Sequence, residues 1–117
     1  MFIIEPTLLF LSELKALNKK YPSIINDVDL FLQSLKENPA KGISLGNGCY
    51  KARIQIRSKG KGKSGGARII TYVKMIKEKV YLLSIYDKSE RDTLTSKEII
   101  EILKISGILS LYEITNR

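Results

Sequence analysis

The chain contains no histidine, and Cys49 is its single cysteine among 117 residues. A disulfide needs two cysteines, while Cys/His zinc sites and Ser/His or Cys/His nucleophile pairs need side chains that this sequence lacks. These site classes are excluded, and we expect neither a metal nor a cofactor. Catalysis would have to use lysine, arginine, tyrosine, a carboxylate or a hydroxyl group. Cys49 is expected to be a small buried residue of a protein in a reducing compartment.

Long apolar runs are also missing. No stretch approaches the roughly 20 apolar residues that span a bilayer, and residues 1–6 lack the basic start of a secretory signal. With 44% hydrophobic and 27% charged residues, the chain is long enough for one hydrophobic core but not for two. We therefore expect one domain over residues 1–117, in the cytoplasm and without a membrane partner.

Acidic residues are absent from the middle of the chain. The net charge is +8, and residues 38–77 carry ten lysines and arginines but no Asp or Glu. A basic charge confined to one segment is typical of a polyanion-binding surface, because each cation that meets a phosphate releases a condensed counterion. The alternative is a solvated surface without a ligand, which is the commoner fate of a charge run.

The hydrophobic pattern predicts an α+β fold that begins with a strand and two helices. Residues 2–5 are predicted as the strand, and Pro6 as the first residue of a helix that runs to about Lys20. A second helix is expected from Pro22 to just before Pro39, which cannot continue a helix. The two helices form a hairpin with one apolar side, and this side is expected to cover a sheet.

Three strands of an antiparallel meander are predicted after a loop at residues 41–48. The strands are residues 50–57, in which apolar and polar side chains alternate, residues 67–75, and residues 80–86. The last of these is apolar on both faces, as expected of an interior strand. A capping box at residues 95–98 then predicts a C-terminal helix.

Basic side chains gather on this meander. Lys51, Arg53 and Arg57 alternate with apolar residues, so they should form a positive surface on the sheet face opposite the helices. Residues 58–66 are predicted as a loop with four glycines and three lysines. We expect a mobile arm that orders against a phosphate backbone, and a flexible hairpin tip without a ligand is the alternative. A nucleotide-binding P-loop is rejected because Arg57 stands where its first glycine is required.

The C-terminal stretch has more apolar residues than one helical stripe uses. They are Ile99, Ile100, Leu103, Ile105, Ile108, Leu109, Leu111 and Ile114. Such residues either complete the core or remain available to a partner protein.

Three segments of the meander carry a pattern in common with a known family. They are residues 49–57, residues 67–73 after an insertion that ends in Gly-Gly-Ala-Arg, and residues 83–91 with Tyr-Asp-Lys-Ser-Glu. The pattern resembles the RelE/ParE superfamily, and within it HigB-type toxins of type II toxin–antitoxin modules. The resemblance implies a RelE-like α+β domain in the cytoplasm of a bacterium: an N-terminal strand, a helical hairpin on an antiparallel sheet with a three-stranded meander, and a C-terminal helix.

The resemblance also implies an activity and its partners. It points to a ribosome-dependent endoribonuclease, an mRNA interferase that inhibits translation, with the ribosome, mRNA and a cognate antitoxin of the helix-turn-helix DNA-binding type as partners. The alternatives are a gyrase-inhibiting toxin of the ParE branch and a non-catalytic RNA-binding or ribosome-binding module. The catalytic candidates are Arg68, Lys88, Tyr86, Lys51 and Arg53. The candidates for binding RNA or the ribosome are Arg57, Lys59, Lys61, Lys63 and Lys74.

RNA cleavage by the 2′-hydroxyl does not strictly need histidine. It needs a base, stabilisation of the pentavalent phosphate and a proton for the 5′-oxygen. We expect Arg68 to contact the scissile phosphate, because it begins a strand beside the lysine-containing loop and matches an arginine of the family that it resembles. Arginine suits this role because it is always protonated. RelE has a tyrosine where this chain has Thr93 or Leu94, and Tyr86 is the replacement from another position. Neighbouring cations should lower the pKa of a tyrosine or lysine, and the general base is left open between them.

Overall fold

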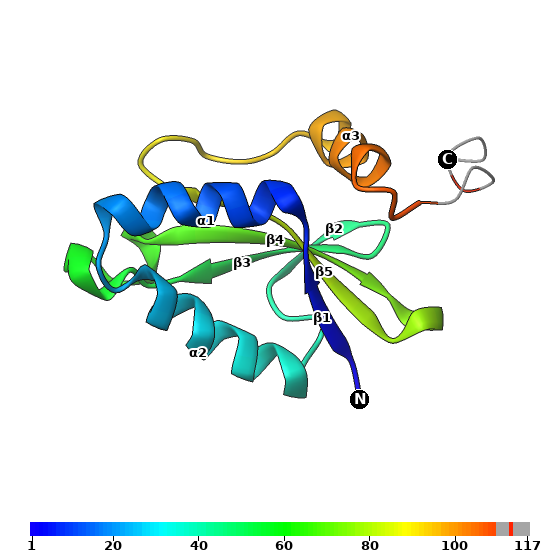
Figure 1. The fold of residues 1–117 in the computed structure, drawn as a ribbon, viewed down its shortest axis with the longest axis horizontal. Coiled ribbons are helices and arrows are strands. Elements are labelled where there is room, and N and C mark those ends of the chain that lie inside the picture. The colour runs from blue at the N-terminus through cyan, green and yellow to red at the C-terminus, as the bar shows by residue number, and fades with distance from the viewer. Residues whose placement is uncertain (110–112, 114–117) are drawn as a thin grey trace.

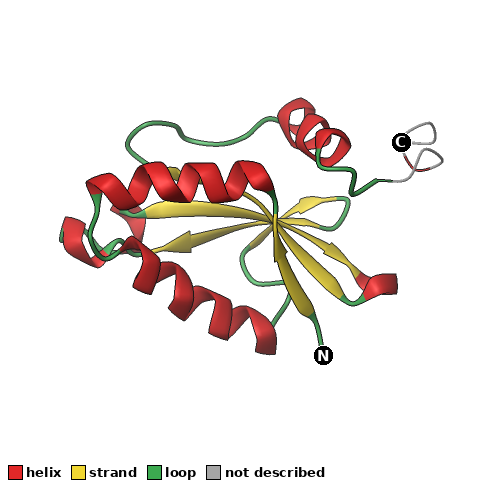
Figure 2. Cartoon of the chain, in the orientation of Figure 1, coloured by secondary structure: helices red, strands yellow, loops and turns green. Residues whose placement is uncertain are grey.

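A five-stranded mixed sheet organises the fold, with strand order β1-β5-β4-β3-β2 (Figures 1 and 2). The computed structural model describes residues 1–109 and Glu113. The strands are β1 (Ile3–Pro6), β2 (Ile43–Gly46), β3 (Cys49–Ile54), β4 (Ala67–Lys74) and β5 (Lys79–Asp87). The helices are α1 (Leu8–Lys20), α2 (Ile24–Glu37) and α3 (Ser96–Ile105), with short 3-10 turns η1 (Arg57–Lys59), η2 (Lys63–Gly65) and η3 (Met75–Lys77). The predicted α+β fold is confirmed, including the meander of β3, β4 and β5.

The helical hairpin packs on one face of the sheet, as predicted (Figure 1). Phe10 of α1 and Phe31 of α2 are buried in one cluster with the sheet residues Ile54 and Ile69. The start of α1 differs from the prediction, because Pro6 is the last residue of β1 and pairs with Leu82 of β5. The N-cap of α1 is Thr7, whose side chain accepts a hydrogen bond from the Phe10 amide.

The opposite face of the sheet is partly covered by α3. The predicted capping box is present: the Glu98 amide donates to the Thr95 hydroxyl, and the Thr95 amide donates to the Glu98 carboxylate. Ile99 and Leu103 of α3 are buried against the sheet. The surface opposite the hairpin is therefore not uniformly basic, because α3 occupies part of it.

The remaining C-terminal apolar residues divide between core and surface. Ile108 and Leu109 join the cluster beneath α3, whereas Ile105 is 79% exposed. Leu111 and Ile114 lie outside the described residues. No helix in the described part of the chain is long and apolar enough to cross a bilayer.

Two boundaries of the predicted meander are wrong. Residues 41–48 contain β2, which pairs with β3 through a turn at Asn47 and Gly48, where φ is 54° and 80°. Positive φ at both turn residues is typical of a tight two-residue hairpin. β3 also ends at Ile54, so Arg57 lies in η1 and not on a strand.

Beyond the end of β1, side chains of α1 and of its N-cap residue form hydrogen bonds with the edge of β5. The Thr7 hydroxyl donates to the carbonyl oxygens of Leu82 and Leu83 at 3.0 and 3.2 Å. The Glu13 carboxylate accepts from the Ser84 hydroxyl at 2.8 Å and the Ile85 amide at 3.2 Å. Burial raises the pKa of Glu13 although both hydrogen bonds act in the opposite direction. The edge of β5 is thus satisfied without a sixth strand.

Candidate functional site

One row of polar side chains crosses β3, β4 and β5. Arg53 of β3 lies opposite Arg68 of β4, and Arg68 lies opposite Tyr86 of β5. Residues directly opposite on neighbouring antiparallel strands project from the same face of a sheet. Lys51 is two residues before Arg53 and therefore shares this face, beside the part that α3 covers. The structure brings these four sequence candidates together.

Arg68 is the most enclosed member of the row. It is 3% exposed. Its Nη1 donates to the carbonyl oxygens of Lys63 and Ala67 at 3.0 and 3.1 Å, and its Nη2 donates to Ser64 O at 3.2 Å. Burial lowers the pKa of Arg68, and the nearby charge of Arg53 adds to this effect. The guanidinium therefore fixes the glycine-rich loop, and its contact with a scissile phosphate stays a prediction.

Tyr86 lies at the β5 end of the row. Its hydroxyl donates to Asp92 O at 3.3 Å, and the Arg91 guanidinium lies 5.7 Å from the centre of its ring. We expected neighbouring cations to lower the pKa of this phenol. The direction is the reverse, because burial raises the pKa of Tyr86 by more than Arg91 and Arg68 lower it.

The segment after β5 adds Lys88 and Arg91 to the site. Lys88 Nζ lies 2.7 Å from Asp92 Oδ1. Arg91 is held by Glu98 at the start of α3, with Nη2 donating to both carboxylate oxygens at 3.0 and 2.8 Å. Tyr86, Arg91 and Asp92 line a hollow of about 580 Å³ that reaches α1. Tyr86, which is otherwise buried, thus borders this hollow, whose lining also includes Glu13 and Glu90.

Arg91 is a residue of the candidate site that was not predicted from the sequence. It lies in the segment that resembles the family, directly after the Tyr-Asp-Lys-Ser-Glu pattern. Its position over Tyr86 depends on Glu98, seven residues later in another element. The only sequence signal for Arg91 was its position directly after the family motif, because the loop that contains Arg91 has no periodic pattern.

Asp87, beside the row, is a buried carboxylate that accepts several hydrogen bonds. Its carboxylate accepts from Lys59 Nζ at 2.6 Å, from the Tyr21 hydroxyl at 2.5 Å and from the amide and hydroxyl of Ser89. Burial disfavours the charged form, but these hydrogen bonds outweigh it and hold the pKa of Asp87 far below its ordinary value. The hydrogen bond to Asp87 in turn raises the pKa of Tyr21.

The glycine-rich loop is anchored at several points, in contrast to the mobile arm that we expected. Arg57 Nε binds Asp27 Oδ1 of α2 at 2.7 Å, and the Ser58 amide donates to Ser23 Oγ at 2.8 Å. The Lys59 side chain is 13% exposed because it is paired with Asp87. A carbonyl at the end of the loop, Gly66 O, accepts from the amide of residue 88. Lys59 therefore does not extend into solvent as an RNA-binding arm.

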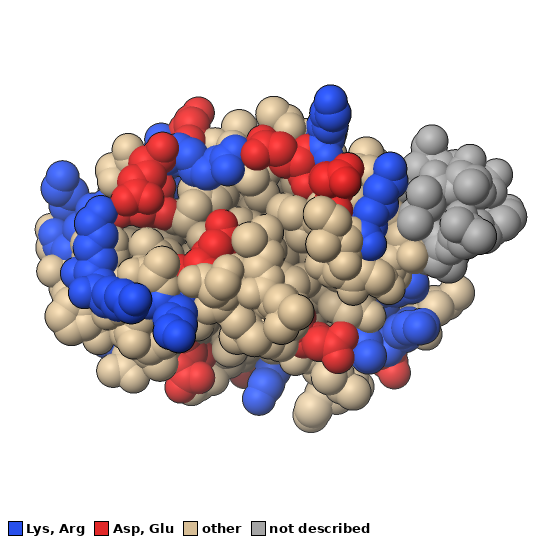
Figure 3. Space-filling model, turned by 45° about the horizontal axis from the view of Figure 1, so that its top comes forward, with Lys and Arg blue, Asp and Glu red and all other residues tan. Residues whose placement is uncertain are grey.

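The cations that stay exposed on this loop are Lys61 and Lys63. Figure 3 shows Lys and Arg gathered at the end of the molecule where the loop lies, at the left of Figure 1. The structure thus leaves these two lysines open to a polyanion, and their role in binding stays a prediction.

Two of the proposed RNA-binding residues lie away from the row. Lys74 is at the far end of β4, about 20 Å from Arg68 at the rise of an extended strand. Its Nζ donates to Ile108 O and to Glu113 Oε1, both at 3.1 Å. Arg57 is turned to the helical side of the sheet by Asp27, so its predicted place on the positive surface is wrong.

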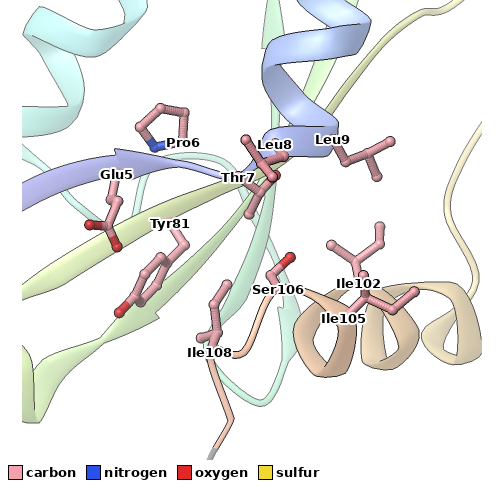
Figure 4. Close-up of a pocket in the computed structure, with 10 residues that line it drawn as sticks. All are labelled: Glu5, Pro6, Thr7, Leu8, Leu9, Tyr81, Ile102, Ile105, Ser106 and Ile108. Carbon is pink, nitrogen blue, oxygen red and sulfur yellow. The ribbon is translucent and has the colours of Figure 1, made fainter.

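An apolar pocket of about 390 Å³ lies apart from the cationic row (Figure 4). It is bounded by the start of α1, by Tyr81 of β5, and by Ile102 and Ile105 of α3. Its lining contains the carboxylate of Glu5 but no cation, so it does not suit a phosphate. Within residues 1–109 and Glu113, no cluster of three or more His, Cys, Asp or Glu that could hold a metal ion occurs.

The geometry at the row suits an anionic ligand that needs a proton donor. Arg53, Arg68 and Lys51 present positive charge, and a neutral phenol stands at the end of the row. Like charges directly opposite each other destabilise a sheet, so the pair of arginines costs folding free energy. A bound phosphate would relieve this repulsion.

Comparisons with known proteins agree with the fold described above. Residues 18–115 match the family model described as the RelE toxin of the RelE/RelB toxin–antitoxin system. A structure of the E. coli toxin RelE in the free state, with two arginines replaced by alanine, aligns with a TM-score of 0.59 and 18% identity, covering 89% of this chain and 96% of that one. The isolated E. coli RelE toxin aligns with a TM-score of 0.55 and 19% identity, covering 93% and 100%.

Proposed function

Because the chain belongs to the RelE toxin family of toxin–antitoxin systems, we propose that it is a ribosome-dependent endoribonuclease. In this proposal it cleaves mRNA on the ribosome and thereby inhibits translation. The observation that supports it best is the row of Arg53, Arg68 and Tyr86 in register on β3, β4 and β5. We also propose the HigB subtype, on the segments at residues 49–57 and 83–91.

The residues of the row divide the steps of the reaction between them. Arg53, which is exposed, binds the scissile phosphate and stabilises its pentavalent form, with the charge of Arg68 beside it. Tyr86 has a raised pKa and is protonated at neutral pH, so it suits the donation of a proton to the 5′-oxygen. Lys51, which shares the face of the row, adds a second cationic contact to the phosphate. The base for the 2′-hydroxyl is left open, because Lys88 is held in an ion pair with Asp92.

Programmed ribosomes provide the test. The purified chain is incubated with ribosomes carrying a defined mRNA, and the 5′ ends of the fragments are mapped. We expect cleavage by the natural protein and a loss of about 10²- to 10³-fold in rate for Arg53→Ala, because a phosphate-stabilising donor is removed. Lys36→Ala, at an exposed lysine of α2, should cleave like the natural protein.

Two results would contradict the proposal. Intact mRNA on translating ribosomes would exclude the nuclease, and inhibition of DNA supercoiling by gyrase would then favour the ParE branch. Equal rates for Arg53→Ala and Lys36→Ala would exclude the row as the catalytic site even if cleavage occurs.

A further inference from the structure

The outer edge of β1 is unpaired. β1 lies at one end of the strand order, and no strand in the described part of the chain pairs with it on the side away from β5. The Ile3 amide donates to Glu78 O on the β5 side. Because main-chain groups alternate in direction along a strand, those of Ile4 and Pro6 point the other way. This edge therefore offers hydrogen-bonding groups to another chain.

An apolar hollow of about 550 Å³ lies beside this edge. It is bounded by β1 and by the two helices of the hairpin, which diverge toward β1 (Figure 1). Leu11 and Leu14 of α1 and Leu32 of α2 belong to its lining. Leu11 is 46% exposed. Exposed apolar side chains around a hollow mark a surface that another protein can cover.

Side chains of opposite charge flank the hollow on its two sides. Lys15 lies one helical turn after Leu11 and so on the same face of α1, and Asp29 of α2 is part of the lining. Both are exposed, and within residues 1–109 and Glu113 neither forms an ion pair. A two-fold axis through the hollow exchanges its sides, so α1 of one copy lies opposite α2 of the other. Lys15 of each copy then meets the partner's Asp29.

We propose that the edge of β1 and this hollow form a two-fold interface between two copies of the chain. Ile4 of one copy pairs with the partner's Ile4 in antiparallel register, and each Pro6 carbonyl accepts from the partner's Phe2 amide. This register needs no amide from Pro6, which is a residue common on strand edges. Leu11 of each copy covers the apolar lining of the partner's hollow.

A second copy fits this surface because a two-fold interface must be complementary to itself. An antiparallel strand edge, an apolar hollow and a pair of opposite charges on its two sides all meet that requirement. The interface is small, since β1 has four residues. We therefore expect a weak dimer with a Kd of about 10 to 100 µM. At about 1 µM, the concentration for the unfolding and cleavage measurements, the chain is a monomer.

Sedimentation equilibrium of the full chain tests the dimer. Between about 5 and 500 µM, the average mass should rise from that of one chain toward that of two. Amide hydrogen exchange identifies the surface that is covered. Exchange at Ile4 should slow as the concentration rises, whereas Ile3, whose amide is already bound to Glu78 O, should change little.

Charge reversals locate the contact between the helices. Lys15→Glu and Asp29→Lys each bring like charges together and should each weaken dimerisation by about tenfold or more. An equimolar mixture of these two variants should dimerise like the natural protein, because every contact in the mixed dimer again joins opposite charges. The control is Lys97→Glu, at an exposed lysine of α3 on the other face of the sheet, which should keep the natural affinity.

The proposal is overturned if the chain stays monomeric up to about 500 µM, at which a Kd of the expected size gives mostly dimer. It is also overturned if a dimer forms but Ile4 exchanges at its monomer rate, or if the mixture of reversed variants dimerises no better than each variant alone. A protein of different sequence that protects Ile4 while the chain alone remains monomeric would assign this edge to that partner instead. Dimerisation is independent of the proposed function, so Arg53→Ala should dimerise like the natural protein.

Discussion

At the scale of single residues, Tyr86 supplies a pH test of the proposed reaction. Replacing it by phenylalanine keeps the ring under Arg91 but removes the proton donor. We expect the cleavage rate of Tyr86→Phe to fall by about 10²-fold. Because the pKa of Tyr86 is raised, the natural protein should keep its proton donor and show no alkaline fall in the proposed cleavage rate up to about pH 9. Single-turnover rates on programmed ribosomes between pH 6 and 9 measure both.

A fall in the natural rate between pH 7 and 8 would contradict the assignment of Tyr86 as the acid. Full activity of Tyr86→Phe would show that Tyr86 is not the acid and that another group donates the proton to the 5′-oxygen.

Asp87 offers a test of stability at the same scale. Its carboxylate is buried, and it compensates the charge of Lys59. Asp87→Asn should lower the free energy of unfolding by about 3 kcal/mol at pH 7, because it breaks a buried ion pair. Urea unfolding monitored by circular dichroism measures the difference.

The pH dependence of this difference has a definite sign. The folded-state pKa of Asp87 lies below its unfolded value of about 3.9, so its contribution is complete above that pH and is lost as the pH falls toward the folded-state pKa. The gap between Asp87→Asn and the natural protein should therefore be constant from pH 6 to 8 and shrink below about pH 4. The control is Asp29→Asn, at an exposed carboxylate of α2, which should match the natural protein throughout.

At the scale of elements, the glycine-rich loop combines fixed ends with exposed lysines. Arg57 and Lys59 are bound to Asp27 and Asp87, while the carbonyl oxygens near η2 are bound to Arg68. The loop therefore presents Lys61 and Lys63 from an ordered backbone, which lowers the entropy cost of binding a polyanion.

The contrast between Lys59, which is paired with Asp87, and the exposed Lys61 and Lys63 predicts different effects when these lysines are replaced. Replacing Lys61 and Lys63 together by glutamine should weaken ribosome binding and flatten its logarithmic salt dependence by about 1.4 to 1.8, since two phosphate contacts are lost. Lys59→Gln should instead lower the stability of the fold, because it leaves Asp87 buried without its ion-pair partner. Binding is measured from 50 to 300 mM salt.

An unchanged salt slope for the Lys61 and Lys63 double variant would show that the loop does not contact phosphate. A Lys59→Gln protein that unfolds at the natural urea concentration would contradict its structural role.

Local patterns in the sequence predicted most of the helices and strands. The predictions failed where contacts between distant residues determine the structure. Helical spacing and strand alternation placed α1, α2 and the meander, because these signals depend on near neighbours. β2 was missed because its four residues lie at an exposed edge and end in glycine. Arg57 was assigned to the wrong face because Asp27, its partner, is 30 positions away.

The candidate site was predictable to a similar extent. Strand alternation and the family resemblance indicated Lys51, Arg53, Arg68 and Tyr86 as site candidates, and the structure places them together. The burial of Arg68 was not predictable, because it depends on how the carbonyl groups of the preceding loop fold back. The raised pKa of Tyr86 has the same origin, since burial is a property of the packed chain.

At the scale of the whole molecule, a toxin requires a partner that holds it inactive. We expect expression of this chain to arrest growth, and co-expression with its cognate antitoxin, of the helix-turn-helix type, to restore growth. The measurement is a growth assay with each neighbouring reading frame, followed by a pull-down. If none of the neighbouring products binds or restores growth, the antitoxin is not of the expected kind.

The parallel pairing of β1 with β5 ties the start of the chain to a strand near its end. Thr7 and Leu82, which share a hydrogen bond, are 75 positions apart, so closure of the sheet depends on a contact of long sequence separation. β5 also carries Tyr86. A nascent chain whose β5 is still inside the exit tunnel has neither a closed sheet nor a complete row of site residues. Under the proposed function, the chain therefore has no complete site with which to act on its own ribosome until β5 has left the exit tunnel.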